Sequence, residues 1–295
     1  MKKSVSLLLA GLMLCGALAG CGGSNDSAES TTSTDTESTG TSGAIHVVSR
    51  EDGSGTRGAF VELTGVEDDN GDNTTVEAEI ANRTDAVLTT VAGNEAAIGY
   101  VSLGSLNDTV KAVTVDGVEA TVDNVKSGTY TLSRPFNIAT KGEPTGVAAD
   151  FIGFIMSADG QAIVGEDYIT VNDNAEAFTS DGSSGHITVG GSSSVSPVME
   201  QLIEAYKAVN PNAQIDLQTS DSTSGMTGAM DGTFAIGMAS RELKDEEAAE
   251  LTGTAIALDG IAVIVNTANT VDNLTMDQIR SIYVGETTDW ADVAA

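Results

Sequence analysis

Apolar residues along this chain alternate between short extended runs and longer stretches with helical spacing. The extended runs predict strands at 45–48, 97–103, 112–115, 187–189, 214–218, 234–238 and 255–265. Amphipathic helical patterns lie between several of these runs. This order of elements predicts α/β layers, in a chain long enough to form two lobes.

Several helices have recognisable start signals. Helices are predicted over 146–156, 196–210 and 276–283, and a further helix after residue 54. Ser196 and Pro197 are a hydroxyl cap followed by proline at the first helical position. The helix after residue 54 should place Ala59, Phe60 and Leu63 on one face.

The first residues have the pattern of a secretory signal. A basic start precedes an apolar run from 5 to 19, which is too short to span a bilayer. Residues 18–21, Leu-Ala-Gly-Cys, resemble the bacterial lipobox, which implies cleavage before Cys21 and a diacylglycerol on its sulfur. The alternative is an ordinary cleaved signal with an incidental cysteine. Cys15 would leave with the signal at 1–21, so the mature chain has no internal disulfide or cysteine-based metal site.

The composition after the signal limits the partners. Residues 22–43 are almost wholly polar and predict a disordered tether. Without the signal the chain has 11 basic and 43 acidic residues, a net charge of −32. That charge argues against nucleic acid and against anionic lipid surfaces, so we expect membrane contact only through the lipid on Cys21. It does not exclude a buried anion site, because exposed charges are screened within about 10 Å at ordinary salt.

The stretch 49–57, Ser-Arg-Glu-Asp-Gly-Ser-Gly-Thr-Arg, places glycines, hydroxyls and a guanidinium where a strand ends and a helix begins. Backbone N–H groups at a helix N-terminus and its dipole favour a bound anion. The alternative is an ordinary strand-to-helix turn with a surface arginine. Hydroxyl-rich stretches at 190–197 and 220–225 repeat this arrangement. All three follow strands, at the edge where open α/β sheets bind ligands.

Four stretches together resemble a known family. They are Val-Ser-Arg-Glu-Asp-Gly-Ser-Gly-Thr-Arg (48–57), Gly-Ser-Ser-Ser-Val-Ser-Pro (191–197), Gly-Met-Ala-Ser-Arg-Glu-Leu (237–243) and Leu-Asp-Gly-Ile-Ala-Val-Ile-Val-Asn (258–266). The chain from 44 to 293 resembles the substrate-binding lipoprotein of the bacterial phosphate ABC transporter. The resemblance implies a two-lobed α/β fold of the periplasmic-binding-protein type (type II), with mixed sheets flanked by helices and phosphate held between the lobes.

The order of these stretches differs from the usual order in that family, where the serine-rich stretch comes first and the stretch at 48–57 comes late. We interpret this as a circular permutation, with a joint at 179–185. One lobe would then comprise 44–134 and 259–295, and the other 135–258. Two truncated halves that pair between molecules, as in a domain-swapped dimer, are the rival account. We expect a monomer.

The resemblance also implies the residues that bind phosphate. They are Arg50, Asp52, Ser54, Gly55, Thr56, Ser193, Ser194 and Ser222. Arg50 would supply the guanidinium and Asp52 the carboxylate that orients it. The family often places an aspartate before Ile236, to accept the proton of hydrogen phosphate, where this chain has Ala235. Asp52 or Asp221 could supply that acceptor instead.

The sequence therefore predicts a binding protein rather than an enzyme. It has no nucleophile, Walker or metalloprotease motif, and an acidic stretch at 67–73 lacks the spacing of a calcium loop. We expect no cofactor or metal. The predicted function is capture of phosphate at the extracytoplasmic face of a bacterial membrane, for delivery to permease subunits of an ABC transporter. The alternatives are binding of another tetrahedral oxyanion such as sulfate, or a sensor or adhesion lipoprotein without transport.

Overall fold

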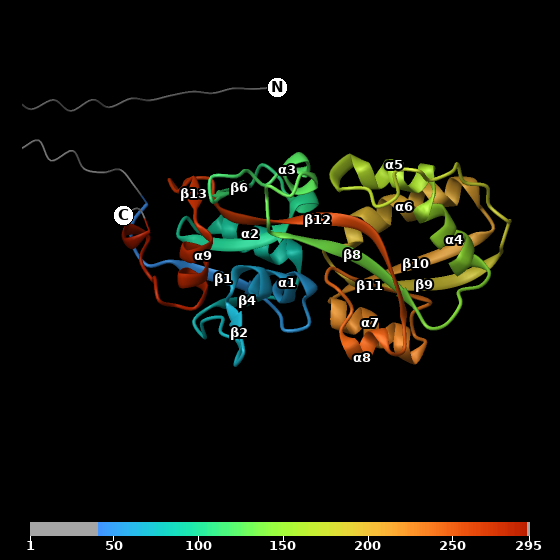
Figure 1. Ribbon diagram of the computed structural model, residues 1–295, viewed down its shortest axis with the longest axis horizontal. Helices are drawn as coiled ribbons and strands as arrows, with labels where there is room; N and C mark the ends of the chain where they lie inside the picture. Colours follow the sequence, from blue (N-terminus) through green and yellow to red (C-terminus); the bar gives the residue numbers. More distant parts are fainter. Residues whose placement is uncertain (1–40, 294–295) are drawn as a thin grey trace, which may run out of the picture. The chain divides into compact units, whose positions relative to one another are not determined.

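A computed structural model of the chain describes residues 41–293. The predicted signal, the lipidated Cys21 and most of the predicted tether lie outside the described residues. Two lobes are joined by two long strands, β8 (Ser133–Thr140) and β12 (Thr252–Asn266), which run side by side (Figure 1). The first lobe contains the elements before β8 and after β12, and the second lobe contains those between them.

The remaining elements of the first lobe are β1 (His46–Arg50), α1 (Gly55–Thr64), β2 (Glu67–Asp68), β3 (Gly71–Asp72), β4 (Glu79–Ala81), α2 (Thr84–Gly93), β5 (Ala97–Ser102), η1 (Leu103–Ser105), β6 (Val110–Ala112), β7 (Thr114–Val115), α3 (Val122–Lys126), β13 (Asn273–Leu274), α9 (Met276–Tyr283) and η2 (Trp290–Asp292). Those of the second lobe are α4 (Val147–Met156), α5 (Ala158–Asp167), β9 (Gly185–Ser192), α6 (Ser196–Val209), β10 (Ala213–Ser220), α7 (Ser222–Asp231), β11 (Ile236–Ala239) and α8 (Asp245–Ala248).

The main sheet runs continuously through both lobes in the order β10-β9-β11-β8-β12-β5-β1-β4. β12 makes this continuity possible because it changes partner along its length. Up to Gly260 it pairs with β8, and from Ile261 it pairs with β5 of the first lobe. The point at which β12 passes from one lobe to the other therefore lies between these two residues.

Each lobe has its own apolar core. In the first lobe the core includes stacked rings of Phe60 and Tyr100, with centroids 3.9 Å apart, and the buried Trp290. In the second lobe α4 and α6 cover the sheet, and Phe151 packs against Tyr206. Within residues 41–293 no single helix is long and apolar enough to cross a membrane; only α4 and α5 together, with a 60° bend between them, have that length and composition.

Most of the strands predicted from the sequence are present, with ends that differ by a few residues. The run at 112–115 is divided between β6 and β7 at Val113, and β8 was not predicted. β8 contains Arg134, Pro135 and Asn137, which interrupt its apolar pattern although Arg134 and Asn137 are buried. Ala59, Phe60 and Leu63 all lie in α1 as predicted; Ala59 and Phe60 are buried, whereas Leu63, at the end of that face, is 38% exposed.

The two ends of the described chain meet in the first lobe. Ala44 forms an antiparallel bridge with Asp289, and the backbone N–H groups of Ile45 and Trp290 donate to Thr288 and Gly43 at 2.8 and 3.0 Å. A permuted chain requires such neighbouring ends, because they would be continuous in the unpermuted order. The permutation itself stays a prediction. The choice between a permuted monomer and a swapped dimer likewise stays a prediction.

The joint at 179–185 is held by one buried carboxylate. Asp150, on α4, accepts hydrogen bonds from Ser180 Oγ at 2.6 Å and from the backbone N–H of Asp181 at 2.9 Å. It also accepts bonds from Tyr206 Oη at 2.6 Å and Asn210 Nδ2 at 3.1 Å. Burial acts to raise the pKa of Asp150, but these hydrogen bonds outweigh it and lower the pKa below the usual 3.8.

Replacing this carboxylate should destabilise the second lobe. We expect Asp150→Asn to lower the free energy of unfolding at pH 7 by about 2 kcal/mol, since hydrogen bonds to a charged group contribute most when buried. Because the pKa of Asp150 is lower in the folded state, its carboxylate stabilises the fold fully at pH values above 3.8, the usual pKa. The difference in unfolding free energy between the wild type and Asp150→Asn should therefore be largest above pH 3.8 and should shrink as the pH falls below that value. Urea unfolding at several pH values measures this, with the exposed Asp108→Asn as control. An equal loss in both variants would contradict the assigned role.

Candidate anion-binding site

The N-termini of helices from both lobes meet where the lobes face each other. Thr56, in the first turn of α1, has its Oγ1 2.8 Å from Ser194 Oγ, just before α6. Thr84, the first residue of α2, has its Oγ1 3.3 Å from the hydroxyls of Ser193 and Ser194. All four side chains are buried. The hydroxyls can each donate or accept, so this cluster can adapt to the oxygens of a small anion. We call the site formed by these four residues the cradle. It also includes residues described below: Arg50, Glu51, Gly55, Ser222 and Ser240.

Arg50 brings a buried positive charge to the cradle. The residue is 2% exposed, and its Nε and Nη2 each donate to the carboxylate of Glu51 at 2.8 Å. Nη2 also lies 3.1 Å from Ser193 Oγ, and Nη1 lies 3.4 Å from Thr84 Oγ1. The guanidinium thus spans both lobes. A planar fork of this kind suits bidentate binding of an oxyanion.

Tyr100, on β5, fixes the end of β1 behind this arginine. Its hydroxyl lies 2.9 Å from Ser49 Oγ and accepts from the backbone N–H of Arg50 at 3.2 Å. Burial raises the pKa of Tyr100 to about 12, so the phenol stays neutral and can act as both donor and acceptor.

The structure corrects the role predicted for Asp52. Its side chain is 96% exposed and pairs with Arg57 at 2.7 Å, so the prediction that Asp52 orients Arg50 is wrong. The turn after β1 directs Glu51 toward the guanidinium and Asp52 toward solvent. Direct contact between Asp52 and an anion stays a prediction, and its exposure does not favour it.

The other wall of the cradle is built by Ser222 and Ser240. Ser222 is the first residue of α7, and its Oγ accepts from the backbone N–H of Ser240 at 3.1 Å. Ser192 Oγ donates to Ser240 Oγ at 2.9 Å. Gly55 of the first lobe lies against this wall: a Cβ there would be 2.4 Å from Ser222 Oγ and 2.9 Å from Ser240 Oγ. Only a glycine allows this approach.

Most of the residues predicted from the sequence therefore come together. Ser54 is the N-cap of α1 and accepts from the backbone N–H of Arg57 at 3.3 Å, so its hydroxyl also serves the helix. Three members of the cradle were not predicted: Glu51, Thr84 and Ser240. Ser240 directly follows β11 and lies within the stretch 237–243 that carries the family resemblance, and a hydroxyl at the end of a strand was the signal that could have identified it.

The expectation that position 235 belongs to the cleft wall is wrong. Ala235 precedes β11, where its backbone N–H donates to Thr188 and its side chain packs against the core of the second lobe. The cradle lies at the other, carboxyl end of β11, beside Ser240. The absence of a carboxylate at position 235 therefore does not weaken the site.

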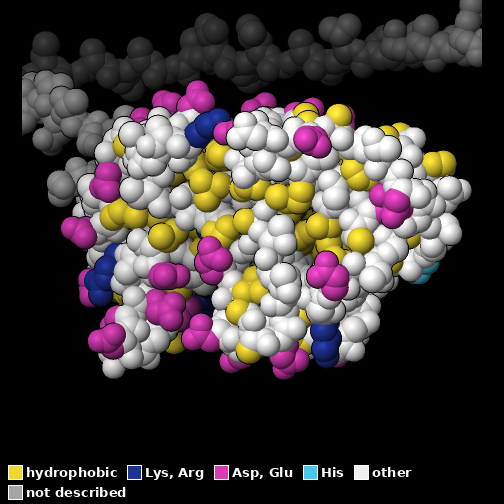
Figure 2. Space-filling model, turned by 45° about the vertical axis from the view of Figure 1, so that its right-hand side comes forward, with side chains coloured by type: hydrophobic (Ala, Val, Ile, Leu, Met, Phe, Trp, Pro, Cys, Tyr) yellow, Lys and Arg dark blue, Asp and Glu magenta, His cyan; other side chains and the backbone are white. Residues whose placement is uncertain are grey.

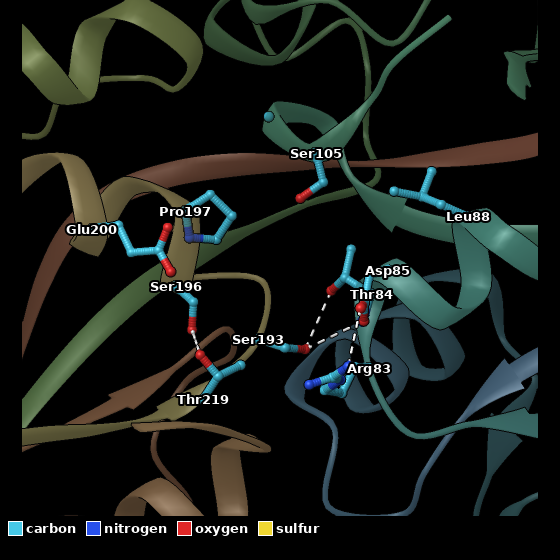
Figure 3. Close-up of a pocket in the computed structure, with 11 residues that line it drawn as sticks. Arg83, Thr84, Asp85, Leu88, Ser105, Ser193, Ser196, Pro197, Glu200 and Thr219 are labelled. Carbon is cyan, nitrogen blue, oxygen red and sulfur yellow. Dashed lines mark hydrogen bonds and ion pairs between the residues drawn. The ribbon is translucent and has the colours of Figure 1, made fainter. Parts of the chain in front are cut away.

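A cavity of about 450 Å³ adjoins the cradle and is lined by residues of both lobes. Its lining consists of Arg83, Thr84, Asp85, Leu88, Gly104, Ser105, Ser193, Ser196, Pro197, Glu200 and Thr219. Figure 3 shows Ser193 pointing across from the second lobe toward Thr84. Thr84 and Ser193 belong to both the cradle and the cavity, so the cavity borders the cradle directly.

Acidic side chains dominate the charged positions on the face shown in Figure 2. The cradle differs from that surface because its guanidinium and hydroxyls are buried. Donors at contact distance determine binding there, whereas the exposed carboxylates are screened by solvent and salt. Within residues 41–293 no cluster of His, Cys, Asp or Glu could hold a metal ion.

Two α/β lobes joined by crossing strands, with a cleft lined by helix N-termini, define a substrate-binding protein of the periplasmic-binding-protein class. The model of the PBP superfamily domain matches residues 25–159 and 176–295. The chain is 48% identical to a phosphate-binding protein PstS 2 of Streptococcus agalactiae, over 99% of this chain and 98% of that protein. A PstS 2 of Streptococcus pneumoniae is 45% identical over 98% of each chain. The chain belongs to the PstS family of phosphate-binding proteins.

A solved structure agrees with this assignment. The crystal structure of a phosphate-binding protein of a phosphate ABC transporter from Streptococcus pneumoniae is 46% identical in sequence. It aligns with a TM-score of 0.69, over 85% of this chain and the whole of that chain. This similarity confirms the two-lobed α/β fold that was predicted from the sequence.

Substitutions at two adjacent acidic residues distinguish the two assignments for the partner of Arg50. Glu51→Gln leaves the buried guanidinium without its ionised partner, so we expect the free energy of unfolding to fall by roughly 2 kcal/mol. Asp52→Asn removes the same charge from an exposed pair and should change it by less than about 0.5 kcal/mol. Denaturant unfolding at neutral pH measures both. A larger loss for Asp52→Asn would restore the original assignment.

A methyl group at Gly55 should prevent the lobes from closing. We expect Gly55→Ala to weaken affinity for inorganic phosphate, the anion that the sequence resemblance implies, by at least about tenfold, because the new Cβ would displace Ser222 and Ser240. Gly58→Ala is the matched control on the same helix, since its Cβ would meet only Arg241 Cδ at 3.8 Å. Calorimetric titration measures the affinity, and thermal unfolding checks that both variants fold. Equal affinities in the two variants would show that the close approach at Gly55 is not needed for binding.

Proposed function

We propose that this chain binds inorganic phosphate in the cradle and delivers it to the permease of an ABC transporter. The observation that carries the proposal is the meeting of Arg50 with hydroxyls from both lobes at one buried point. The PstS relatives, named as phosphate-binding proteins, support the choice of ligand. The solved relative, named as part of a phosphate ABC transporter, supports the choice of partner.

The cradle suits a tetrahedral oxyanion. Arg50 can offer two parallel N–H groups to two oxygens, while Thr56, Ser193, Ser194, Ser222 and Ser240 offer hydroxyls around the others. Hydroxyls that now bond to each other across the lobes, such as those of Thr56 and Ser194, would donate to the anion instead. The new hydrogen bonds would be charge-assisted and therefore stronger. Because those bonds reach both lobes, binding should favour the closed arrangement over the open one.

Hydrogen phosphate carries a proton that sulfate lacks, so the site needs an acceptor to bind the protonated form. The hydroxyls can supply one because each accepts as well as donates. The carboxylate of Glu51, in the cradle, is already paired with Arg50. Hydroxyls do not exclude an unprotonated anion strongly, and sulfate is therefore the competing ligand in any test.

The same proposal places the protein at the extracytoplasmic face, anchored by a lipid on Cys21. The sequence of residues 18–21 supports the anchor. We propose that it acts as a monomeric carrier rather than an enzyme; its relatives are named as phosphate-binding proteins, which supports the carrier role.

Loss of the buried guanidinium should abolish tight binding. We expect Arg50→Gln to weaken phosphate affinity by at least roughly a hundredfold, the effect of losing a bidentate charge-assisted pair. Arg280→Gln removes a partly exposed cation of α9 that pairs with Glu286 and donates to the Gly65 carbonyl; it is the control for a general change in charge and should bind normally. Calorimetry with phosphate, sulfate and arsenate measures the affinities. Tight sulfate binding without phosphate binding would refute the phosphate assignment.

A further inference from the structure

A buried ion pair lies at the point where the two lobes join. Asp259 of β12 and Arg134 of β8 are direct partners in the antiparallel ladder, and the residues are 1% and 3% exposed. Arg134 donates to Asp259 Oδ2 from Nη2 at 3.1 Å and from Nε at 3.3 Å. β12 passes to the first lobe within two residues, between Gly260 and Ile261.

This pair has a bonded partner in each lobe. On one side Ser102, the last residue of β5, donates to Asp259 Oδ1 at 2.9 Å. On the other side Arg134 Nη1 donates to the backbone carbonyl of Ser240 at 3.2 Å. The backbone N–H of Ser240 in turn donates to Ser222 Oγ, in the wall of the cradle. A continuous chain of hydrogen bonds therefore runs from the first lobe, through the crossing strands, to the cradle.

We propose that Asp259 and Arg134 are positioning residues: they hold the Ser222 and Ser240 wall in register with the first lobe, and phosphate binding depends on them although neither contacts the anion. This inference rests on the proposed function. Ser102 belongs to the first lobe and Ser240 to the second, so the pair is bonded to both lobes where the strands cross. In the structure the cradle is assembled and every hydrogen bond of this chain is present.

The physical cost of the pair supports a role beyond stability. The free energy that two charges lose when they leave water exceeds the free energy of their attraction, unless further hydrogen bonds satisfy them. Apolar residues can often replace such a buried pair without loss of stability. Ser102 and the Ser240 carbonyl supply those further bonds. Arg134 also lies over the ring of Phe136, 5.4 Å from its centroid, which fixes the plane of the guanidinium.

The protonation of Asp259 supplies a specific test. Burial raises the pKa of Asp259 to about 6, although the charge of Arg134 and the hydrogen bond from Ser102 oppose the rise. The other titratable groups that act on this carboxyl are Tyr168, which follows α5, and Tyr130, which precedes β8. Burial raises the pKa of both phenols, so they stay neutral. Arg50 of β1 acts on Arg134 as a like charge.

The direction of the pH effect follows from these groups. Above pH 6 the carboxylate is ionised and holds Arg134. Below it the carboxyl takes up a proton and the chain of bonds to Ser240 loosens. Wild-type phosphate affinity should therefore lose the contribution of this pair as the pH falls through about 6.

The experiment compares calorimetric phosphate affinities of the wild type, Asp259→Asn and Asp150→Asn from pH 5 to pH 8. At pH 8 we expect Asp259→Asn to bind about tenfold more weakly than the wild type. At pH 5 the ratio of wild-type affinity to Asp259→Asn affinity should approach one. Phosphate itself titrates equally in both measurements, so its protonation does not affect this ratio. Asp150→Asn removes another buried carboxylate, away from the cleft, and should leave the affinity unchanged at every pH.

Three outcomes would overturn the inference: wild-type affinity for Asp259→Asn at pH 8, a ratio independent of pH, or equal weakening in Asp150→Asn. Should Asp259→Asn fail to fold, Ser102→Ala removes only the first-lobe bond and should bind about threefold more weakly at pH 8. Wild-type affinity for Ser102→Ala would then overturn it. Failure of the wild type itself to bind phosphate at pH 8 would refute the proposed function instead, and this inference with it.

Discussion

The guanidinium of Arg50 is a charge buried between two lobes, and such a charge must be paired. Glu51 supplies its ionic partner from the same turn, while Thr84 and Ser193 supply hydroxyls from opposite sides of the cleft. The other features of the cradle follow from this requirement. The glycine at 55 lets the lobes approach, Tyr100 fixes the end of β1, and the helix N-termini surround the charge with donors. An oxyanion between the lobes would meet a site whose donors are already positioned.

The crossing strands determine how this site is assembled. β12 pairs with β8 in one half and with β5 in the other, so the main sheet continues through both lobes. The change of partner takes place between two adjacent residues, Gly260 and Ile261. Asp259 and Arg134 at the crossing are buried and bonded to Ser102 of the first lobe and Ser240 of the second. The acidic surface has little part in this geometry. It affects solubility and long-range interaction with anions, both of which depend on salt.

The sequence predicted the α/β class and most of the strands because these depend on local patterns, and the family resemblance implied most members of the cradle. Strand β8 was missed because Arg134 and Asn137 are buried by tertiary contacts that periodicity does not show. The exchange of roles between Glu51 and Asp52 depends on which way a tight turn directs two adjacent carboxylates. Thr84 and Ser240 join the cradle through contacts between segments distant in sequence. The family resemblance implied the ligand, but it placed one wall of the site at Ala235, which precedes β11, whereas Ser240 follows the carboxyl end of that strand.

A crystal structure of the mature protein grown with phosphate tests the central claim most directly. The account predicts one tetrahedral anion between the N-terminus of α1 and the hydroxyls of Ser193, Ser194 and Ser222, within hydrogen-bonding distance of Arg50. Density for the anion elsewhere, or a cradle without an anion at saturating phosphate, would contradict it.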